Sequence, residues 1–139
     1  MRTEFELTRE GDDFVARLDP AQANALHEAL SYARRGDATD AYLKVLLGAD
    51  RGVVDGLVQR LSGPRTEPLD VRLRPEELHV VLSALTNAAA HFVTADGLFS
   101  QEPFLIRLGF YRENFDALAL AIVNAAYRAY EAQADEVTE

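Results

Sequence analysis

The sequence contains neither cysteine nor tryptophan, and Lys44 is its only lysine. Without cysteine, the chain has no disulfides, no thiolate metal ligands and no cysteine nucleophile. No run of about 18 apolar residues occurs, so no helix is expected to span a membrane. The first residues lack the apolar stretch of a signal peptide. We therefore expect a single cytoplasmic domain, residues 1–139, large enough to form its own core.

The motifs of common enzyme classes are also missing. There is no Gly-x-Ser-x-Gly elbow, no phosphate loop ending in Gly-Lys-Ser/Thr and no full dinucleotide fingerprint. The three histidines, His27, His79 and His91, are scattered. The sequence therefore predicts no catalytic, cofactor-binding or metal-binding residues and no cofactor. Enzymatic activity stays open, and its absence is favoured.

Charge limits the partners that the chain could bind. Its 23 acidic residues against 14 basic ones give a formal net charge of −9. Such a balance repels a phosphate backbone, so nucleic acid is not an expected partner. An acidic surface attracts basic proteins and speeds their encounter. The expected partner is therefore a basic protein, or a second copy of the chain in a homodimer.

An internal repeat is the most informative feature that is present. Residues 14–33 align without gaps on 69–88, and residues 45–61 align on 106–122. Eleven of these 37 aligned positions are identical, among them Pro20/Pro75 and Gly48/Gly109. The sequence therefore predicts an α+β fold of two related strand-helix-strand-helix halves, residues 14–61 and 69–122, with pseudo-twofold symmetry.

Periodicity predicts the individual elements. Alternating apolar residues on both sides of Gly11-Asp12 predict an N-terminal hairpin over residues 3–18. Asp19 and Pro20 are typical of a helix start, as is Pro75 in the second half. Residues 41–47 and 104–109 are short apolar runs that could be strands or short helices. We favour a strand for 41–47 because the run is short and ends at Gly48.

A long C-terminal helix is expected from about Tyr111 to Ala134. Its apolar residues form two stripes rather than one, which indicates either a central helix or one that also serves an oligomer interface. The first stripe consists of Phe115, Leu118, Ile122 and Ala125, and the second consists of Leu120, Val123, Tyr127 and Tyr130.

A repeated Arg-x-x-x-Asp spacing marks the second helix of each half. Arg51/Asp55 and Arg112/Asp116 are i, i+4 pairs, which predicts weak surface ion pairs. The alternative is recognition of an anion at the glycine-to-helix corner, where backbone N–H groups are exposed. Near residues 96–104, Phe99 belongs to a segment without a counterpart in the first half, and it either covers the core or contacts a partner.

One motif resembles a known group of proteins. Phe104-x-x-Arg107-x-Gly109-x-x-Arg112-Glu113, preceded by Glu77-Leu78 and Ala84-Leu85, resembles small uncharacterised bacterial proteins, some of them similar to immunity proteins of toxin systems. The resemblance covers residues 75–122, and Leu46 replaces Arg107 in the first half. The candidate interaction residues are Phe99, Arg107, Tyr111, Arg112 and Asp116.

Three functional hypotheses follow from the sequence. The favoured one is a non-enzymatic protein-binding domain, immunity-like or regulatory. The alternative is a small-molecule-binding domain, or an enzyme, with a site between the two halves. The third is a structural homodimer formed by the last helix.

Overall fold

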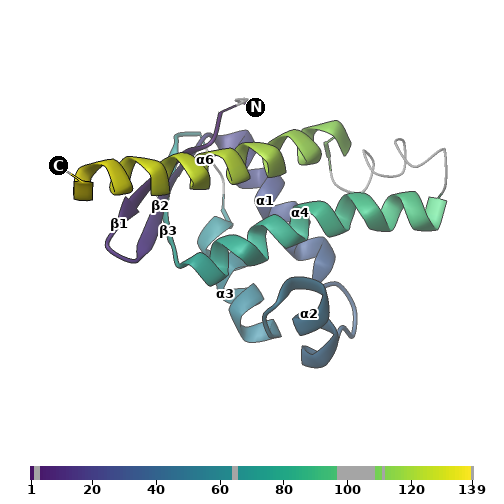
Figure 1. The fold of residues 1–139 in the computed structure, drawn as a ribbon. Helices are drawn as coiled ribbons and strands as arrows, with labels where there is room; N and C mark the ends of the chain where they lie inside the picture. The colour runs from purple at the N-terminus through teal and green to yellow at the C-terminus, as the bar shows by residue number, and fades with distance from the viewer. Residues whose placement is uncertain (2–3, 64–65, 97–108, 111, 139) are drawn as a thin grey trace.

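The structure is a computed structural model that describes residues 1, 4–63, 66–96, 109–110 and 112–138. The described elements form an α+β fold, as predicted, in which a three-stranded antiparallel sheet is packed on one face by helices (Figure 1). Their order is β1 (Glu6–Glu10), β2 (Asp13–Leu18), α1 (Pro20–Ala33), α2 (Asp40–Leu47), α3 (Arg51–Leu61), β3 (Leu69–Leu73), α4 (Pro75–Asp96) and α6 (Arg112–Thr138).

The predicted N-terminal hairpin is confirmed. β1 and β2 pair antiparallel, and the turn between them uses Gly11 with a φ of 64°, which glycine adopts without strain. β3 pairs with the other edge of β2, giving the strand order β1-β2-β3. Alternate residues point to opposite faces, so one face of the sheet is buried and the other is charged. The buried face carries Phe14, Ala16, Leu18, Val71 and Leu73.

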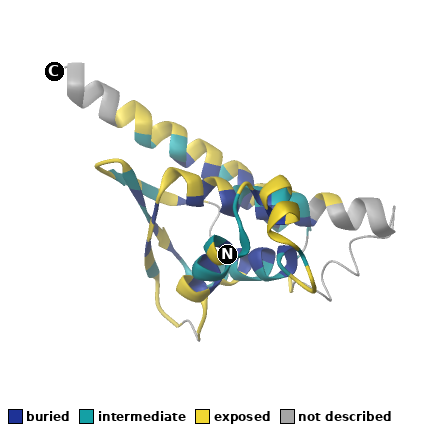
Figure 2. Ribbon diagram, turned by 90° about the horizontal axis from the view of Figure 1, so that it is seen from below, coloured by how far each residue is buried: buried dark blue, intermediate teal, exposed yellow. Residues whose placement is uncertain are grey.

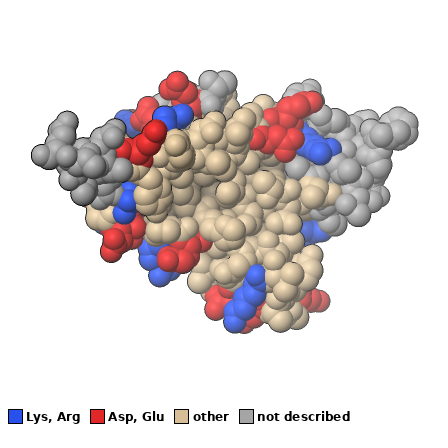
Figure 3. All heavy atoms as spheres, viewed as in Figure 1, with Lys and Arg blue, Asp and Glu red and all other residues tan. Residues whose placement is uncertain are grey.

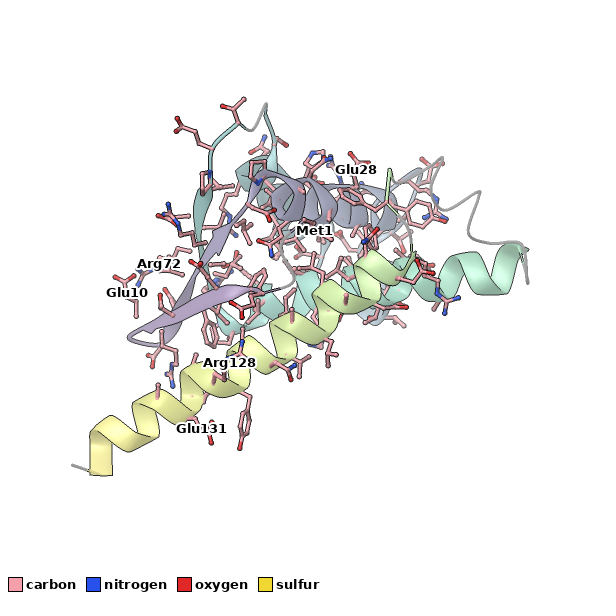
Figure 4. All side chains as sticks on the ribbon, turned by 90° about the horizontal axis from the view of Figure 1, so that it is seen from above. Met1, Glu10, Glu28, Arg72, Arg128 and Glu131 are labelled. Carbon is pink, nitrogen blue, oxygen red and sulfur yellow. The ribbon has the colours of Figure 1, made fainter. Side chains whose placement is uncertain are left out.

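The charged outer face shows a regular pairing across the strands. Arg17 stands opposite Glu6 on β1 and opposite Asp70 on β3, and its Nη1 lies 3.3 Å from Asp70 Oδ1. At the hairpin end, Arg72 Nε donates to Asp13 Oδ2 at 3.0 Å, and this hydrogen bond raises the pKa of Arg72. Figure 4 shows Arg72 and Glu10 side by side at this end. Acidic and basic side chains therefore alternate in the row of Glu6, Arg17 and Asp70, and at the hairpin end Arg72 lies close to the two acids Glu10 and Asp13.

Two helices begin with the same hydrogen bond, in which the side chain of the third helical residue accepts from the backbone N–H of the residue before the helix. Asp19 caps α1, and the buried Gln22 side chain accepts from the Asp19 backbone N–H at 3.0 Å. At α4, the buried Glu77 accepts from the Arg74 backbone N–H at 2.9 Å, in the same position of the helix. Both helices then place proline at their first residue, where no N–H is required.

The expectation of a strand at residues 41–47 is wrong, because these residues form α2. Thr39 caps the helix by accepting from the Tyr42 N–H at 3.1 Å, and Gly48 ends it in the left-handed region with a φ of 80°. Only Leu43 and Leu47 are fully buried, and Val45 between them is 88 % exposed. A strand would have placed all three side chains on one face, whereas a helix places Leu43 and Leu47 together and turns Val45 away. The first half is therefore strand-helix-helix-helix. Of the matching apolar run at 104–109 in the second half, residues 104–108 lie outside the described residues.

The core lies between the sheet and the helices (Figure 2). α1 and α4 pack against each other, while α3 packs on α1 and α6 packs on α4. α6 also contacts β1, so this helix crosses from the helical layer to the first strand of the sheet. With 27 residues it is about 40 Å long, and it extends beyond the sheet at its C-terminal end (Figure 1).

Candidate functional site

The two apolar stripes predicted for the last helix have different roles. The first stripe is in the core, because Phe115, Leu118, Ile122 and Ala125 are all buried. The second remains at the surface: the exposed fractions are 61 % for Leu120, 48 % for Val123, 66 % for Tyr127 and 48 % for Tyr130. We call these four residues the α6 stripe. Their spacing of three, four and three residues makes them neighbours along one side of the helix.

The α6 stripe borders a surface with little charge. In Figure 3 the centre of the face over α6 and α4 carries no Lys, Arg, Asp or Glu, and the charged side chains gather at its rim. Among the α4 residues from 77 to 90 whose side chains the structure describes, those exposed are His79, Thr86 and Ala90, none of them a carboxylate, lysine or arginine. An uncharged centre with a charged rim is the usual arrangement of a protein–protein interface.

Of the candidate interaction residues, the structure brings two together. Arg112 Nε lies 3.9 Å from Asp116 Oδ2 at the start of α6, which confirms the predicted i, i+4 ion pair. Asp116 precedes Leu120 by one helical turn and so lies at one end of the α6 stripe. Phe99, Arg107 and Tyr111 lie outside the described residues.

In the first half, the predicted Arg51/Asp55 ion pair is wrong. Asp55 pairs instead with Arg34, whose Nη1 lies 2.5 Å from Asp55 Oδ1. The Arg51 guanidinium donates to the backbone oxygens of Arg34 and Ala38 at 3.1 and 2.8 Å. Arg51 therefore fixes the chain between α1 and α2, which is a structural role that the local spacing did not reveal.

The N-terminus of α3 does not offer the anion site considered from the sequence. Its Val53 N–H donates to Asp50 Oδ1 at 3.1 Å, and its Arg51 N–H donates to Asp40 Oδ1 at 3.0 Å. Two carboxylates of the chain already accept from these donors. A further anion at this corner would be repelled by both of them.

A groove of about 570 Å³ runs between β1 and α6. One wall consists of the consecutive residues 4–9, and the other consists of Ala125, Arg128, Ala129 and Ala132. Sequence reasoning missed this groove, since it joins segments from opposite ends of the chain. The available signal was the spacing of Ala125, Ala129 and Ala132, which places three small side chains on one side of a helix.

Two further hollows lie among the helices. One of about 450 Å³ lies beside the N-terminal part of α1 and the end of α3, where His27 Nδ1 is 3.5 Å from Glu28 Oε1. The other, of about 30 Å³, lies between α1, α2 and α4 and includes Asn87. In the described ranges, no three His, Asp or Glu side chains are grouped so that they could hold a metal ion. None of the described helices has the length and hydropathy needed to cross a membrane.

Comparisons with known proteins add no assignment. The chain matches no protein-family model, no curated protein and no solved structure.

Proposed function

We propose that this protein is a non-enzymatic protein-binding domain that docks a basic partner on the α6 stripe. The observation that carries the proposal is the exposure of Leu120, Val123, Tyr127 and Tyr130 in one row. Single exposed apolar residues are ordinary, but a continuous row with two tyrosines is typical of an interaction surface. The immunity-like or regulatory role is proposed on the resemblance of residues 75–122.

The spacing and the charges support a helical, basic partner. Apolar residues at alternating intervals of three and four suit an amphipathic helix lying along α6. Acidic residues stand at both ends of the row: Asp116 before Leu120 and Glu131 after Tyr130. A partner helix with basic residues at its ends would be attracted at both places. A second copy would bring its own acids to these ends, so a basic partner is favoured over a homodimer.

The alternative, a small-molecule site between the halves, has less support. The helices α1 and α4 pack against each other, and Leu26, Leu30 and Leu85 on these helices are buried in the core. The hollow between α1, α2 and α4 has about 30 Å³, which is room for about one water molecule. The hollow of about 450 Å³ beside α1 also reaches Phe110 of the second half, but its only titratable lining residues are His27 and Glu28, which lie 3.5 Å from each other.

The test is a comparison of three baits in a lysate of the protein's own host. These are the wild-type chain, a stripe variant Leu120→Glu/Tyr127→Glu, and a control Val45→Glu on α2, where the side chain is 88 % exposed. We expect the wild type and the control to retain a basic protein in stoichiometric amount. The stripe variant should retain at least about tenfold less, since a charge buried in an apolar interface is strongly unfavourable.

Circular dichroism of all three baits establishes that the variants are folded. Retention of no protein, or equal retention by the stripe variant, would reject the proposal. A wild-type mass twice that of the stripe variant in light scattering would keep the surface but replace the basic partner by a second copy.

We also propose that the two halves arose by duplication and are related by a pseudo-twofold axis. Support comes from the sheet register. The sequence repeat relates Ala16 to Val71, and these two residues face each other across β2 and β3. A twofold axis through this pair exchanges the two flanking pairs, Phe14↔Leu73 and Leu18↔Leu69, as the same repeat requires.

The helix caps give independent support for the duplication. The repeat relates Gln22 to Glu77, and each accepts a hydrogen bond from the backbone N–H three residues earlier. An X-ray structure tests the proposal. Residues 13–33 and 51–61 should superpose on 68–88 and 112–122 by a rotation of roughly 180°. A rotation far from this value would reject the pseudo-twofold relation.

A further inference from the structure

β1 is an edge strand with a groove along its free side. It pairs with β2 on one side, and in the described part of the chain no strand pairs with it on the other. Successive residues of a strand direct their N–H and C=O groups to opposite edges, so about half of those in β1 point away from β2. An exposed edge of this kind is a template for an added strand.

The position of the groove follows from the residues that line it. All six residues from Glu4 to Arg9 contribute, although their side chains alternate between the two faces of the sheet. A hollow lined by residues from both faces of the sheet must run along the edge of the strand rather than over one face. No residue of β2 lines it, so it lies on the free side of β1.

α6 provides the wall above this edge. Three alanines, Ala125, Ala129 and Ala132, face the groove at helical spacing. Because alanine side chains are short, they leave space between the helix and the position next to β1. Figure 4 shows Arg128 and Glu131 following each other along this part of α6, beside the strands. A fourth strand placed here would have backbone partners on β1 and a helical cover on its inner face.

We propose that the groove binds an extended segment of a partner protein, which adds to β1 as a fourth strand and carries lysine or arginine on its outward face. Main-chain hydrogen bonds to β1 supply affinity, and the alternate side chains supply specificity. Small apolar side chains of the segment point inward, under the alanines of α6. Basic side chains point outward, beside Glu4 and Glu6.

The charge pattern of the sheet selects basic residues for the outer face. Glu6, Arg17 and Asp70 face one another in one row across the three strands. Their charges alternate, and the next position beyond Glu6 belongs to the added strand. A basic residue there continues the alternation, because opposite charges on neighbouring strands attract.

A second copy of β1 fits this edge poorly. It would bring its own outward-facing acids, Glu4, Glu6 and Glu10, against the same residues, and like charges on adjacent strands are destabilising. The inward-facing Arg9 does not offset them. Its guanidinium lies 4.3 Å from the Tyr130 ring centroid, and its Nη2 donates to the Gly11 backbone oxygen at 3.1 Å. The favoured occupant is therefore a basic segment of another protein.

This inference is separate from docking on the α6 stripe. The alanines of the groove lie on a different side of α6 from Leu120, Val123 and Tyr127, and the two surfaces meet only where Tyr130 contacts Arg9. A partner can therefore occupy either site alone, and substitutions at Leu120 and Tyr127 leave the contact between Tyr130 and Arg9 in place. The two proposals can therefore fail independently.

The experiment uses the full-length protein and a capped, fluorescein-labelled peptide of seven alternating lysine and valine residues. A second peptide has proline at the central valine, and a third has glutamate in place of lysine. Fluorescence anisotropy measures their affinities for the wild type, for Glu6→Lys and for the control Asp37→Lys in the exposed loop between α1 and α2. Hydrogen exchange of the backbone N–H groups of residues 4–9 locates the bound peptide.

We expect the lysine peptide to bind at least about tenfold more tightly than the proline and glutamate peptides, because proline removes a strand hydrogen bond and glutamate reverses the charge. Glu6→Lys should weaken binding at least about fivefold, and Asp37→Lys less than about twofold. Exchange within residues 4–9 should slow. Binding should be unchanged in Leu120→Glu/Tyr127→Glu, which separates this site from the α6 stripe.

Three results would overturn the proposal. They are no binding of the lysine peptide, equal binding of the proline peptide, or equal weakening by Glu6→Lys and Asp37→Lys. The last of these would show attraction to the net charge of the protein rather than to this edge.

Discussion

Replacing Phe115 by alanine is expected to destabilise the protein by about 3–5 kcal/mol, the usual cost of removing a buried phenylalanine. Phe115 has 0 % of its surface exposed and anchors the start of α6 in the core. Its ring also lies near Phe110, with the ring centroids 6.0 Å apart. The substitution removes these contacts and leaves a cavity beneath the helix.

Urea unfolding at neutral pH measures this effect, and Asn124→Ala on the exposed side of α6 is the matched control. The control should change the free energy of unfolding by less than about 0.5 kcal/mol. A loss below about 1 kcal/mol for Phe115→Ala would show that α6 is not fixed on the core. Both proposed surfaces would then lose their structural basis, because each has α6 as one of its parts.

Replacing Glu77 by alanine is expected to cost about 2–4 kcal/mol, since it removes a buried acceptor shared by several donors. Glu77 accepts from the Arg74 N–H at 2.9 Å and from the Arg74 Nε at 3.3 Å, and it pairs with Arg60. Arg60 also donates to the Arg72 backbone oxygen at 2.7 Å, so it links α3 to β3 and α4. The exposed part of the Arg60 side chain can regain water, which keeps the cost below that of a fully buried pair.

Glu77→Gln should lose only about 1 kcal/mol, because an amide oxygen can still accept from the Arg74 N–H. Gln22 already makes this hydrogen bond to Asp19 at the start of α1. Glu76→Gln in the same helical turn is the control, as Glu76 is exposed. If Glu77→Gln is as unstable as Glu77→Ala, the amide does not replace the carboxylate and the two caps are not equivalent.

The stability of the wild type should also fall in acid because of Glu77. Burial alone would raise the pKa of Glu77, but the Arg74 N–H and the Arg60 guanidinium outweigh it, so the pKa lies below its ordinary value of 4.5. The unfolded chain then binds more protons between these two pKa values, and stability rises with pH across that window. The stabilisation is complete above pH 4.5 and is lost as the pH falls through the lowered value.

Urea unfolding of the wild type and Glu77→Gln at several pH values measures this contribution. The difference in their free energies of unfolding should be constant at neutral pH and should shrink as the pH is lowered below about 4.5. A constant difference throughout the acid range would contradict the lowered pKa.

Local sequence signals predicted those features whose causes are local. Alternation around Gly11-Asp12 predicted the hairpin, and Asp19-Pro20 predicted the start of α1. The two stripes of α6 were also predicted, since helical spacing alone places Phe115 and Leu120 on different sides of one helix. The pattern indicated that the exposed stripe serves an interface. It did not indicate which residues surround the stripe, because α4 contributes to the same face from another part of the chain.

The tertiary structure decided the features in which distant segments meet. The seven-residue run at 41–47 fits either a strand or a helix. It forms α2, which buries Leu43 and Leu47 against the core and leaves Val45 exposed, whereas a strand would have turned all three to the same face. Asp55 pairs with Arg34 at the end of α1, and not with Arg51 four residues before it, because the packing of α1 on α3 brings Arg34 close to Asp55.

The groove depends on the same kind of long-range contact. Its walls, Glu4 to Arg9 and Ala125 to Ala132, come from opposite ends of the chain. The sequence by itself determined that β1 is a strand and that these alanines share one side of a helix. Only the packing of α6 across the sheet placed the alanines beside the free edge of β1, because burial of the other α6 stripe fixes the direction in which the helix crosses.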